Sequence, residues 1–167
     1  MKKSIYLNGK AQSYRDTADW RAVIGLLQRV SRAEVQVGSD VVGRIDRGLL
    51  VLIGVQRRDD EQRADRLLDR LLGYRVFPAP AGRMNLDLRD VGGGLLLVPQ
   101  FTLAADTRKG RRPGFSGAAT PEQGRRLFDY LLDRARGRDV PVCSGRFGAD
   151  MQVSLVNDGP VTFWLET

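Results

Sequence analysis

Continuous apolar runs alternate with amphipathic stretches along most of this chain. The runs at 48–55 (GLLVLIGV) and 95–98 (LLLV) are typical of strands that are buried on both faces. The alternation of residues 28–37 predicts a strand with one buried face. Residues 38–40 (GSD) predict a turn into a partner strand at 41–45. Further short strands are expected at 75–77, 140–144 and 151–156, and residues 84–88 are expected to form either another short strand or a turn.

Two segments carry apolar side chains at helical spacing, with start and stop signals at their ends. The first begins after Asp59 or Asp60, either of which can cap a helix, and it ends near Gly73. The second begins at Thr120 with a capping box and a proline at the first helical position, and it ends at Gly137. About seven or eight strands and two main helices predict an α+β fold, a compact single domain with a largely antiparallel, barrel-like sheet.

The N-terminal segment differs from the rest of the chain. Residues 1–22 are polar and lack a sustained hydrophobic period. We therefore expect a flexible N-terminal extension over 1–22 and one domain over 23–167, which is long enough for a single core. No apolar stretch is long enough to span a bilayer, and no apolar segment follows Lys2 and Lys3 as it would in a secretory signal. We expect no association with a membrane.

The residue inventory excludes several kinds of active site. The chain contains no histidine and a single cysteine, Cys143. Nucleophiles activated by histidine are therefore excluded, and so are metal sites that depend on histidine. Carboxylates, backbone dipoles or the substrate itself must carry any hydrolytic chemistry. A single cysteine fits a reducing cytoplasm, and Cys143, beside Val142 in a predicted strand, is expected to be a small core residue.

Positive charge gathers in one loop. The formal net charge is +7, which favours partners that carry phosphate. Four cations fall within the five residues 108–112: Arg108, Lys109, Arg111 and Arg112. Two interpretations stay open, a solvated basic loop and a contact with the phosphate backbone of a nucleic acid. Arg146, which precedes Phe147, is a weaker instance of the same idea.

Polar residues at the end of a predicted buried strand could line a pocket. Gln100, Phe101 and Thr102 follow the run 95–98. A threonine hydroxyl is a poor nucleophile without a base, so we favour a positioning role for Thr102, with the backbone N–H groups of Phe101 and Thr102 as oxyanion donors. The alternative is a capped strand end. Asp106 and Asp150 are a less favoured general-base pair, because carboxylates are common on surfaces and at helix caps.

The segment 157–162 (NDGPVT) joins two strand-like runs through Gly159 and Pro160. Glycine tolerates unusual backbone angles, and proline fixes its own φ and lacks an N–H group. The step is therefore typical of a tight turn, and an ordinary hairpin turn is the simplest interpretation. The functional alternative is a turn that aims backbone carbonyl and amide groups at a ligand, which suits a chain without histidine.

Three collinear stretches together resemble the D-aminoacyl-tRNA deacylase family. They are QFTL at 100–103 with ADTRKG at 105–110, then GRFGADM at 145–151, then NDGPVT at 157–162. Residues 27–30 (LQRV) are similar to the first strand of the family. The resemblance runs from about residue 23 to residue 167, which is nearly the whole expected domain.

The resemblance implies an enzyme that hydrolyses the ester bond of D-aminoacyl-tRNA, and of glycyl-tRNA mischarged on tRNA-Ala, to free tRNA and amino acid. It implies a homodimer with active sites at the interface, and no metal or organic cofactor. In the family, the carbonyl groups of a Gly-cis-Pro step from one subunit exclude L-aminoacyl-tRNA from the active site of the other. The implied role is translation quality control in the cytoplasm.

The family motifs assign expected roles to individual residues. Gln100, Phe101 and Thr102 match the motif that lines the pocket for the terminal adenosine, and their expected catalytic roles are backbone donation and positioning. The 2′-hydroxyl of that adenosine is implied to help activate water. The residues that match the chiral selector and the arginine that steadies it are Gly159, Pro160 and Arg29.

One position departs from the family pattern, and two other hypotheses stay open. Where the family usually has serine before the glutamine, this chain has Pro99, which removes a hydroxyl and a backbone donor. The second hypothesis is an RNA-binding module without catalysis, which the basic loop 108–112 favours. The third is a dimeric scaffold protein, for which no specific feature argues.

Overall fold

The computed structural model describes residues 4–7, 10–13 and 23–167. The strands β1 (Ser4–Leu7) and β2 (Lys10–Ser13) pair with each other in antiparallel fashion. These two strands are the only described part of the extension that we expect over residues 1–22. The rest of that segment lies outside the described residues, so its flexibility stays a prediction.

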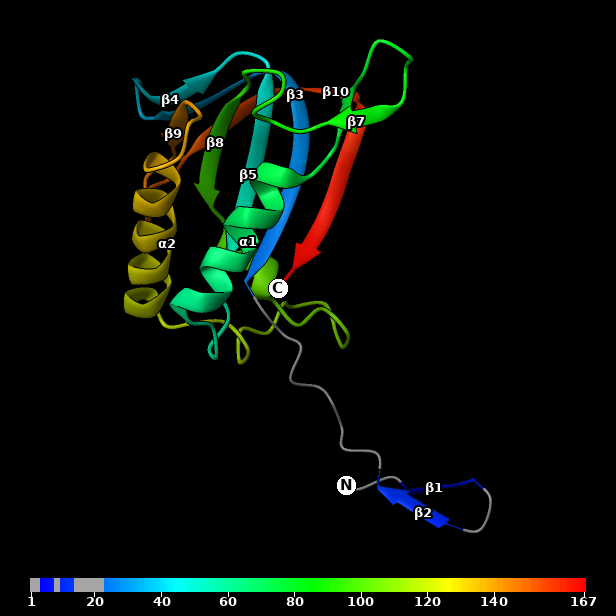
Figure 1. Ribbon diagram of the computed structural model, residues 1–167. Coiled ribbons are helices and arrows are strands. Elements are labelled where there is room, and N and C mark those ends of the chain that lie inside the picture. The colour runs from blue at the N-terminus through cyan, green and yellow to red at the C-terminus, as the bar shows by residue number, and fades with distance from the viewer. Residues whose placement is uncertain (1–3, 8–9, 14–22) are drawn as a thin grey trace.

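Six strands form the main sheet, in the order β10–β3–β5–β8–β9 with β4 also paired to β3 (Figure 1). Their bounds are β3 (Ile24–Val37), β4 (Asp40–Ile45), β5 (Gly48–Gly54), β8 (Gly94–Pro99), β9 (Val142–Ser144) and β10 (Gln152–Glu166). The sheet curls until β4 also contacts β8 and β9, which makes it a nearly closed barrel. The predicted fold class is confirmed.

The sheet is mixed because two helices connect successive strands. Strand β3 is antiparallel to β4, β5 and β10, whereas β5–β8 and β8–β9 are parallel pairs. Helix α1 (Glu61–Gly73) lies between β5 and β8 in the chain, and α2 (Pro121–Arg136) lies between β8 and β9. A crossover that contains a helix returns the chain in its original direction. The strands β6 (Phe77–Pro78) and β7 (Met84–Leu86) form a separate small hairpin.

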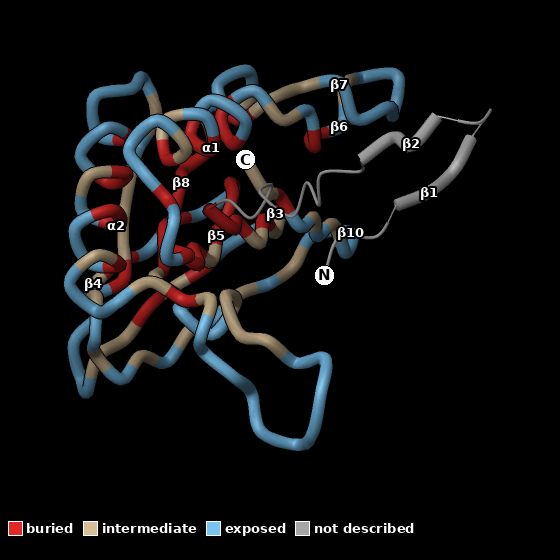
Figure 2. Tube along the Cα trace, turned by 90° about the horizontal axis from the view of Figure 1, so that it is seen from below, coloured by how far each residue is buried: buried red, intermediate tan, exposed pale blue. Residues whose placement is uncertain are grey.

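Two apolar cores lie on opposite faces of β5 and β8. Both strands are buried along most of their length (Figure 2). Leu49 and Val51 point into the larger core, which α1 and α2 cover, whereas Leu50 points into the barrel. On β8, Leu95 packs under the helices, and Leu96 packs inside the barrel. The continuous apolar runs in the sequence therefore reflect strands that are buried on both faces, as predicted.

The helices begin where their capping residues predict. The side chain of Asp60 accepts a hydrogen bond from the Arg63 N–H at 2.9 Å, and Thr120 accepts one from the Gln123 N–H at 3.3 Å. The Gln123 side chain does not return to Thr120. It donates instead to the carbonyl oxygens of Arg57 (3.0 Å) and Asp59 (3.2 Å), which ties the start of α2 to the β5–α1 turn. Of the helices in the described part of the chain, none is long and apolar enough to cross a membrane.

The segment 157–162 is not the hairpin turn that we expected. Strand β10 continues through it and pairs with β3 on both sides, with Asn157 opposite Val30 and Thr162 opposite Gln28. The four residues 158–161 lie opposite Arg29 alone, so they form a wide bulge in one long strand. The prediction is wrong because both strand-like runs pair with the same neighbour.

Candidate active site

A cavity of about 470 Å³ opens beyond the ends of β5 and β8. Its volume is typical of small-ligand sites. Gln100 and Thr120 contribute polar groups, and Thr120 is also the cap of α2. The apolar walls come from the barrel core, α2 and the 145–151 segment, and they include Ile53, Val55, Val98, Phe128, Phe147 and Met151.

Backbone donors stand at the mouth of this cavity. The Gln100 N–H donates to the Ile53 carbonyl at 2.7 Å and so anchors the short 3₁₀ helix η1 (Phe101–Ala104) to β5. The N–H groups of Phe101 and Thr102 donate to no described residue, because the first turn of a helix lacks partners for its donors. Gln100 and Phe101 line the cavity, and Thr102 follows directly. The arrangement can stabilise an oxyanion.

The Thr102 hydroxyl has no base to activate it. It accepts a hydrogen bond from the Gln100 side-chain amide at 2.5 Å, and an amide cannot take its proton. No carboxylate or lysine among the residues described here bonds to it. Pro99, in place of the usual serine, ends β8 opposite Ile53 and lines the cavity. The geometry favours positioning and backbone roles for this segment.

One wall of the cavity is held in place by an arginine that the sequence did not reveal. The guanidinium carbon of Arg125, on α2, lies 5.0 Å from the centroid of the Phe147 ring. The same guanidinium donates to the Phe147 carbonyl at 3.3 Å, and the ring packs on Phe128 with centroids 6.4 Å apart. Arg125 therefore fixes both the ring and the backbone of Phe147. Its spacing of 22 residues from Phe147 carries no local signal.

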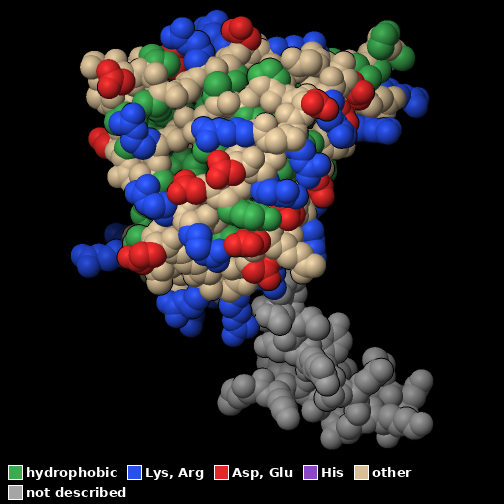
Figure 3. All heavy atoms as spheres, turned by 60° about the vertical axis from the view of Figure 1, so that its left-hand side comes forward, with side chains coloured by type: hydrophobic (Ala, Val, Ile, Leu, Met, Phe, Trp, Pro, Cys, Tyr) green, Lys and Arg blue, Asp and Glu red, His purple; other side chains and the backbone are tan. Residues whose placement is uncertain are grey.

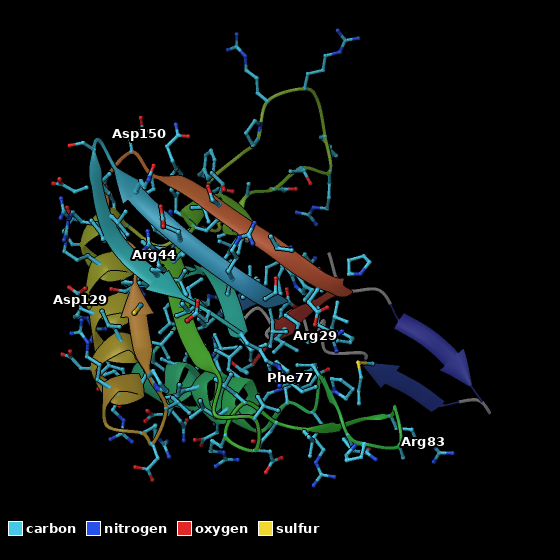
Figure 4. All side chains as sticks on the ribbon, turned by 90° about the horizontal axis from the view of Figure 1, so that it is seen from above. Arg29, Arg44, Phe77, Arg83, Asp129 and Asp150 are labelled. Atoms are coloured by element: carbon cyan, nitrogen blue, oxygen red, sulfur yellow. The ribbon has the colours of Figure 1, made fainter. Side chains whose placement is uncertain are left out.

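Arg29 holds one side of the bulge in β10. This residue is buried, and its Nε donates to the Asp158 carbonyl at 3.2 Å and pairs with the Asp158 carboxylate at 3.1 Å. Its Nη1 donates to the Val76 carbonyl at 2.5 Å. Figure 4 shows Arg29 close to Phe77, the first residue of β6. Arg29 therefore contacts the segment 157–162, and its role in steadying a selector stays a prediction.

Asn157 holds the other side of the bulge. Its amide donates to the Thr162 hydroxyl at 2.8 Å, and its side-chain oxygen accepts from the Val161 N–H at 3.2 Å. The Gly159–Pro160 peptide bond is cis, and Gly159 has a φ of +127°, which side chains rarely adopt. A Cβ at position 159 would also lie 2.8 Å from Val161 Cγ2. The bulge thus requires glycine, and it exposes residues 158–160 at the surface.

The bulge and the N–H donors belong to different regions of one chain. Gly159 lies opposite Arg29, which pairs with Leu49 of β5, whereas Gln100 is bonded to Ile53 of the same strand. Four residues of β5 separate these two positions, which corresponds to about 13 Å along the strand. The predicted catalytic and selecting residues therefore do not meet within a single chain.

The basic loop leaves the body near η1. Backbone hydrogen bonds between Asp106 and Gly114, of 2.7 and 2.9 Å, close its base. Arg108 pairs with Asp106 at 2.6 Å. This carboxylate therefore holds the loop in place, and it does not form the general-base pair with Asp150 that we considered. Lys109, Arg111 and Arg112 form no ion pair with any described residue.

Arginines on the helices are used differently. Figure 3 shows positive and negative side chains interleaved over one face of the molecule. Three arginines on α2 or just after its end pair with carboxylates of α1 at 2.7–2.9 Å: Arg126 with Glu61, Arg134 with Asp65, and Arg138 with Asp69. Much of the basicity is thus neutralised on the helices, and the loop 108–112 keeps cations available for a partner. Within the described ranges, no group of three His, Cys, Asp or Glu residues could hold a metal ion.

Cys143 has a structural environment. It is half-buried, packs against the barrel core and donates to the Arg44 carbonyl at 3.2 Å. The predicted packing role of this cysteine therefore agrees with its surroundings.

Comparison with known proteins decides the family. The sequence model described as D-Tyr-tRNA(Tyr) deacylase matches residues 26–166. The chain belongs to the D-aminoacyl-tRNA deacylase family. The D-aminoacyl-tRNA deacylase of Alkalilimnicola ehrlichii is 69% identical over 144 residues, which cover 86% of this chain and 96% of that protein. The deacylase of Stutzerimonas stutzeri is 64% identical over 143 residues, which cover 86% and 99%.

Two solved structures share this fold. The c-Myc DNA unwinding element binding protein superposes with a TM-score of 0.82 at 35% identity, covering 86% of this chain and 98% of that one. A probable eukaryotic D-amino acid tRNA deacylase, at 22% identity, shares the fold with a TM-score of 0.74 and covers 87% and 100%. As a member of the D-aminoacyl-tRNA deacylase family, the chain is a hydrolase. The first motif contains the turn at residues 100–102 that carries the two N–H donors, which we call the donor turn. The second motif forms part of one cavity wall, and the third forms the bulge.

Proposed function

We propose that this deacylase hydrolyses the ester bond of D-aminoacyl-tRNA, with the terminal adenosine in the 470 Å³ cavity. The observation that carries the proposal is the pair of unengaged N–H groups, on Phe101 and Thr102, beside Gln100 at the mouth of that cavity. They are placed to bind the oxygen on which negative charge develops when water attacks the ester carbonyl.

The reaction needs no activated side chain. Water adds to the carbonyl carbon, the two N–H groups stabilise the oxyanion, and the intermediate collapses with release of the 3′-oxygen of the adenosine, which takes up a proton. An aminoacyl ester is already reactive, so backbone donors and orientation supply the remaining acceleration. The 2′-hydroxyl of the same ribose helps to activate the water. A chain without histidine is suited to this route.

We further propose that Gly159 and Pro160 of a second copy complete each site and reject L-amino acids through their carbonyl groups. Within one chain these residues lie at least about 13 Å from the donor turn. In a two-fold symmetric dimer, a bulge that reaches the partner's donor turn implies the reciprocal contact, so both sites form together. Homodimer formation is therefore part of the catalytic proposal.

Trp164 is the residue that we expect the second copy to cover. It is 50% exposed and lies on β10 opposite Leu26, between the bulge and the donor turn. Trp164→Glu should give a monomer in sedimentation experiments and lose deacylation activity. Val41→Glu is the matched control, because Val41 is 44% exposed on β4. A Trp164→Glu protein that stays dimeric and active would contradict this interface.

The decisive experiment compares D- and L-esters. Purified protein should release D-tyrosine from D-Tyr-tRNA and leave L-Tyr-tRNA largely intact. Equal rates on the two esters would refute the selector, and the absence of hydrolysis would refute the enzyme in favour of an RNA-binding module. Glycyl-tRNA mischarged on tRNA-Ala is a further substrate that we propose, and the same assay tests it. Quality control of translation in the cytoplasm is the role that these activities would serve.

Replacement of Thr102 separates two mechanisms. Thr102→Ala keeps the backbone N–H group and removes the hydroxyl that contacts Gln100. If backbone donors carry the chemistry, this variant should retain measurable hydrolysis of D-Tyr-tRNA. Complete loss, with fold and tRNA binding intact, would instead identify the hydroxyl as the nucleophile.

A further inference from the structure

An exposed pair of aromatic rings stands outside the cavity. Phe101 and Phe115 have ring centroids 5.2 Å apart with planes tilted by 43°. Phe101 is 62% exposed and Phe115 is 38% exposed. Single apolar residues at the surface are common, but adjacent exposed rings at the mouth of a site indicate a binding surface.

The base of the loop holds Phe115 in place. Its carbonyl accepts a hydrogen bond from the Ala118 N–H at 3.1 Å, and the preceding residue, Gly114, is bonded twice to Asp106. Loop residues 107–116 are exposed along their length (Figure 2). Phe115 is therefore a fixed ring at the foot of an exposed basic loop.

The two residues that flank this ring, Gly114 and Ser116, line a further cavity. It measures about 450 Å³ and is lined by Asp106, Arg108, Lys109, Arg112, Gly114 and Ser116. Three cations thus face one carboxylate, which Arg108 already engages. Lys109 and Arg112 have no ion-pair partner in the described part of the chain, so they can bind a phosphate.

The two rings connect residues that line the two cavities, and we call this series of residues the track. Phe101 lines the first cavity and contacts Phe115, whose neighbours Gly114 and Ser116 line the second cavity. Aromatic rings beside a basic groove are the features that bind single-stranded nucleic acid, because every base can stack on a ring while cations hold the backbone. A duplex would not fit this track, since its bases are already stacked.

We propose that this track is a second nucleotide subsite. It binds the nucleotide that precedes the terminal adenosine of the RNA. The base stacks on Phe115, and the phosphate that joins the two nucleotides lies among Arg108, Lys109 and Arg112. The inference rests on the proposed function, which places the terminal adenosine in the first cavity. It adds that the enzyme binds the single-stranded 3′ end over two nucleotides.

The first experiment compares a long and a short substrate. Phe115→Ala should lower kcat/KM for D-Tyr-tRNA roughly 5- to 150-fold, the range expected for one stacked base. The ratio of kcat/KM on D-Tyr-tRNA to that on D-tyrosyl-adenosine should fall by the same factor, because the short ester lacks the second nucleotide. Phe115→Trp should restore the ratio, and Val41→Ala serves as a control on a distant exposed apolar residue.

Two results would overturn the subsite. An equal loss on both substrates would mean that Phe115 only supports Phe101, and no loss on either would mean that no base stacks there. If the unmodified protein hydrolyses neither ester, the proposed function fails. In that case the affinity of the trinucleotide CCA still tests the subsite, since Phe115→Ala should weaken it by a similar factor.

The second experiment tests the phosphate. Replacement of one phosphate-binding cation should make the slope of log Kd for CCA against log salt concentration less positive by about 0.7. We expect this change for Lys109→Gln and for Arg112→Gln. Arg83→Gln is the matched control, because Arg83 is an exposed cation near the β6–β7 hairpin (Figure 4). An unchanged slope in both loop variants, or an equal change in the control, would refute the contact.

Discussion

Substitution of Asp59 offers a test of how the turn between β5 and α1 is held beside the cavity. This residue is 5% exposed, and its Oδ2 accepts a hydrogen bond from the Gln56 N–H at 2.6 Å. Its Oδ1 lies 3.5 Å from Arg63 Nη1. Burial raises the pKa of Asp59 from 3.8 to about 6, and Asp60 adds to the increase, although Gln56 and Arg63 oppose it. The folded protein therefore favours the protonated form of the Asp59 side chain more than the unfolded chain does.

The sign of the effect follows from this direction. Because the pKa of Asp59 is higher in the folded state, its contribution to stability is fully present below pH 3.8 and is lost as the pH rises through about 6. At pH 8 the buried carboxylate destabilises the fold by up to about 3 kcal/mol, at about 1.4 kcal/mol per pKa unit. Asparagine keeps the oxygen that accepts from Gln56 and cannot ionise. Asp59→Asn should therefore be more stable than the original protein at pH 8 by up to about 3 kcal/mol.

Urea unfolding at a fixed protein concentration measures this difference. The free energies of unfolding of the two proteins should converge as the pH falls from 8 to 4. Asp129→Asn, on the exposed surface of α2 (Figure 4), controls for the loss of a negative charge in itself. A stability difference that does not change with pH, or an Asp59→Asn protein that is clearly less stable at pH 8, would refute the reasoning. The hydrogen bond from Gln56 and the attraction of Arg63 would then outweigh burial.

Three further substitutions test the cavity wall, the bulge and the sheet. Arg125→Gln removes the cation above Phe147, so KM for D-Tyr-tRNA should rise about 2- to 5-fold with kcat retained, and Arg125→Lys should restore part of the loss. Arg29→Lys keeps the charge but loses the forked contacts, and the ratio of D- to L-ester hydrolysis should fall at least about tenfold. Gly48→Ala would place a Cβ 1.9 Å from the Gly94 carbonyl oxygen, so urea unfolding should show a loss of about 3 kcal/mol or more.

The fold could be read from the sequence where local pattern and tertiary burial agree. The runs at 48–55 and 95–98 are apolar on both faces because they lie between two cores. Asp60 and Thr120 cap the helices because their side chains satisfy free N–H groups of the first turn. The parallel pairing of β5 with β8 was not predicted, since it depends on where the chain returns after α1.

The site was less accessible to sequence reasoning, because its decisive contacts join distant segments. Residues 157–162 have the composition of a turn, yet they form a bulge. Val156 before them and Thr162 after them both pair with the same strand, β3. The contact of Arg125 with Phe147 and the stacking of Phe101 on Phe115 likewise have no local signal. Only the resemblance to a family led us to expect that residues 100–103, 145–151 and 157–162 contribute to one site.

In the mechanism that we propose, the division of labour in the site follows from the reactivity of the substrate. An aminoacyl ester needs little chemical activation, so two backbone N–H groups are sufficient catalysts, but any such site would also hydrolyse the L-esters that translation requires. Selectivity must therefore come from a group whose position does not yield to the substrate. Arg29 and Asn157 brace the bulge from both sides, one through Asp158 and the other through Val161 and Thr162. The proposal therefore makes discrimination depend on the rigidity of the bulge and not on the reactivity of a side chain.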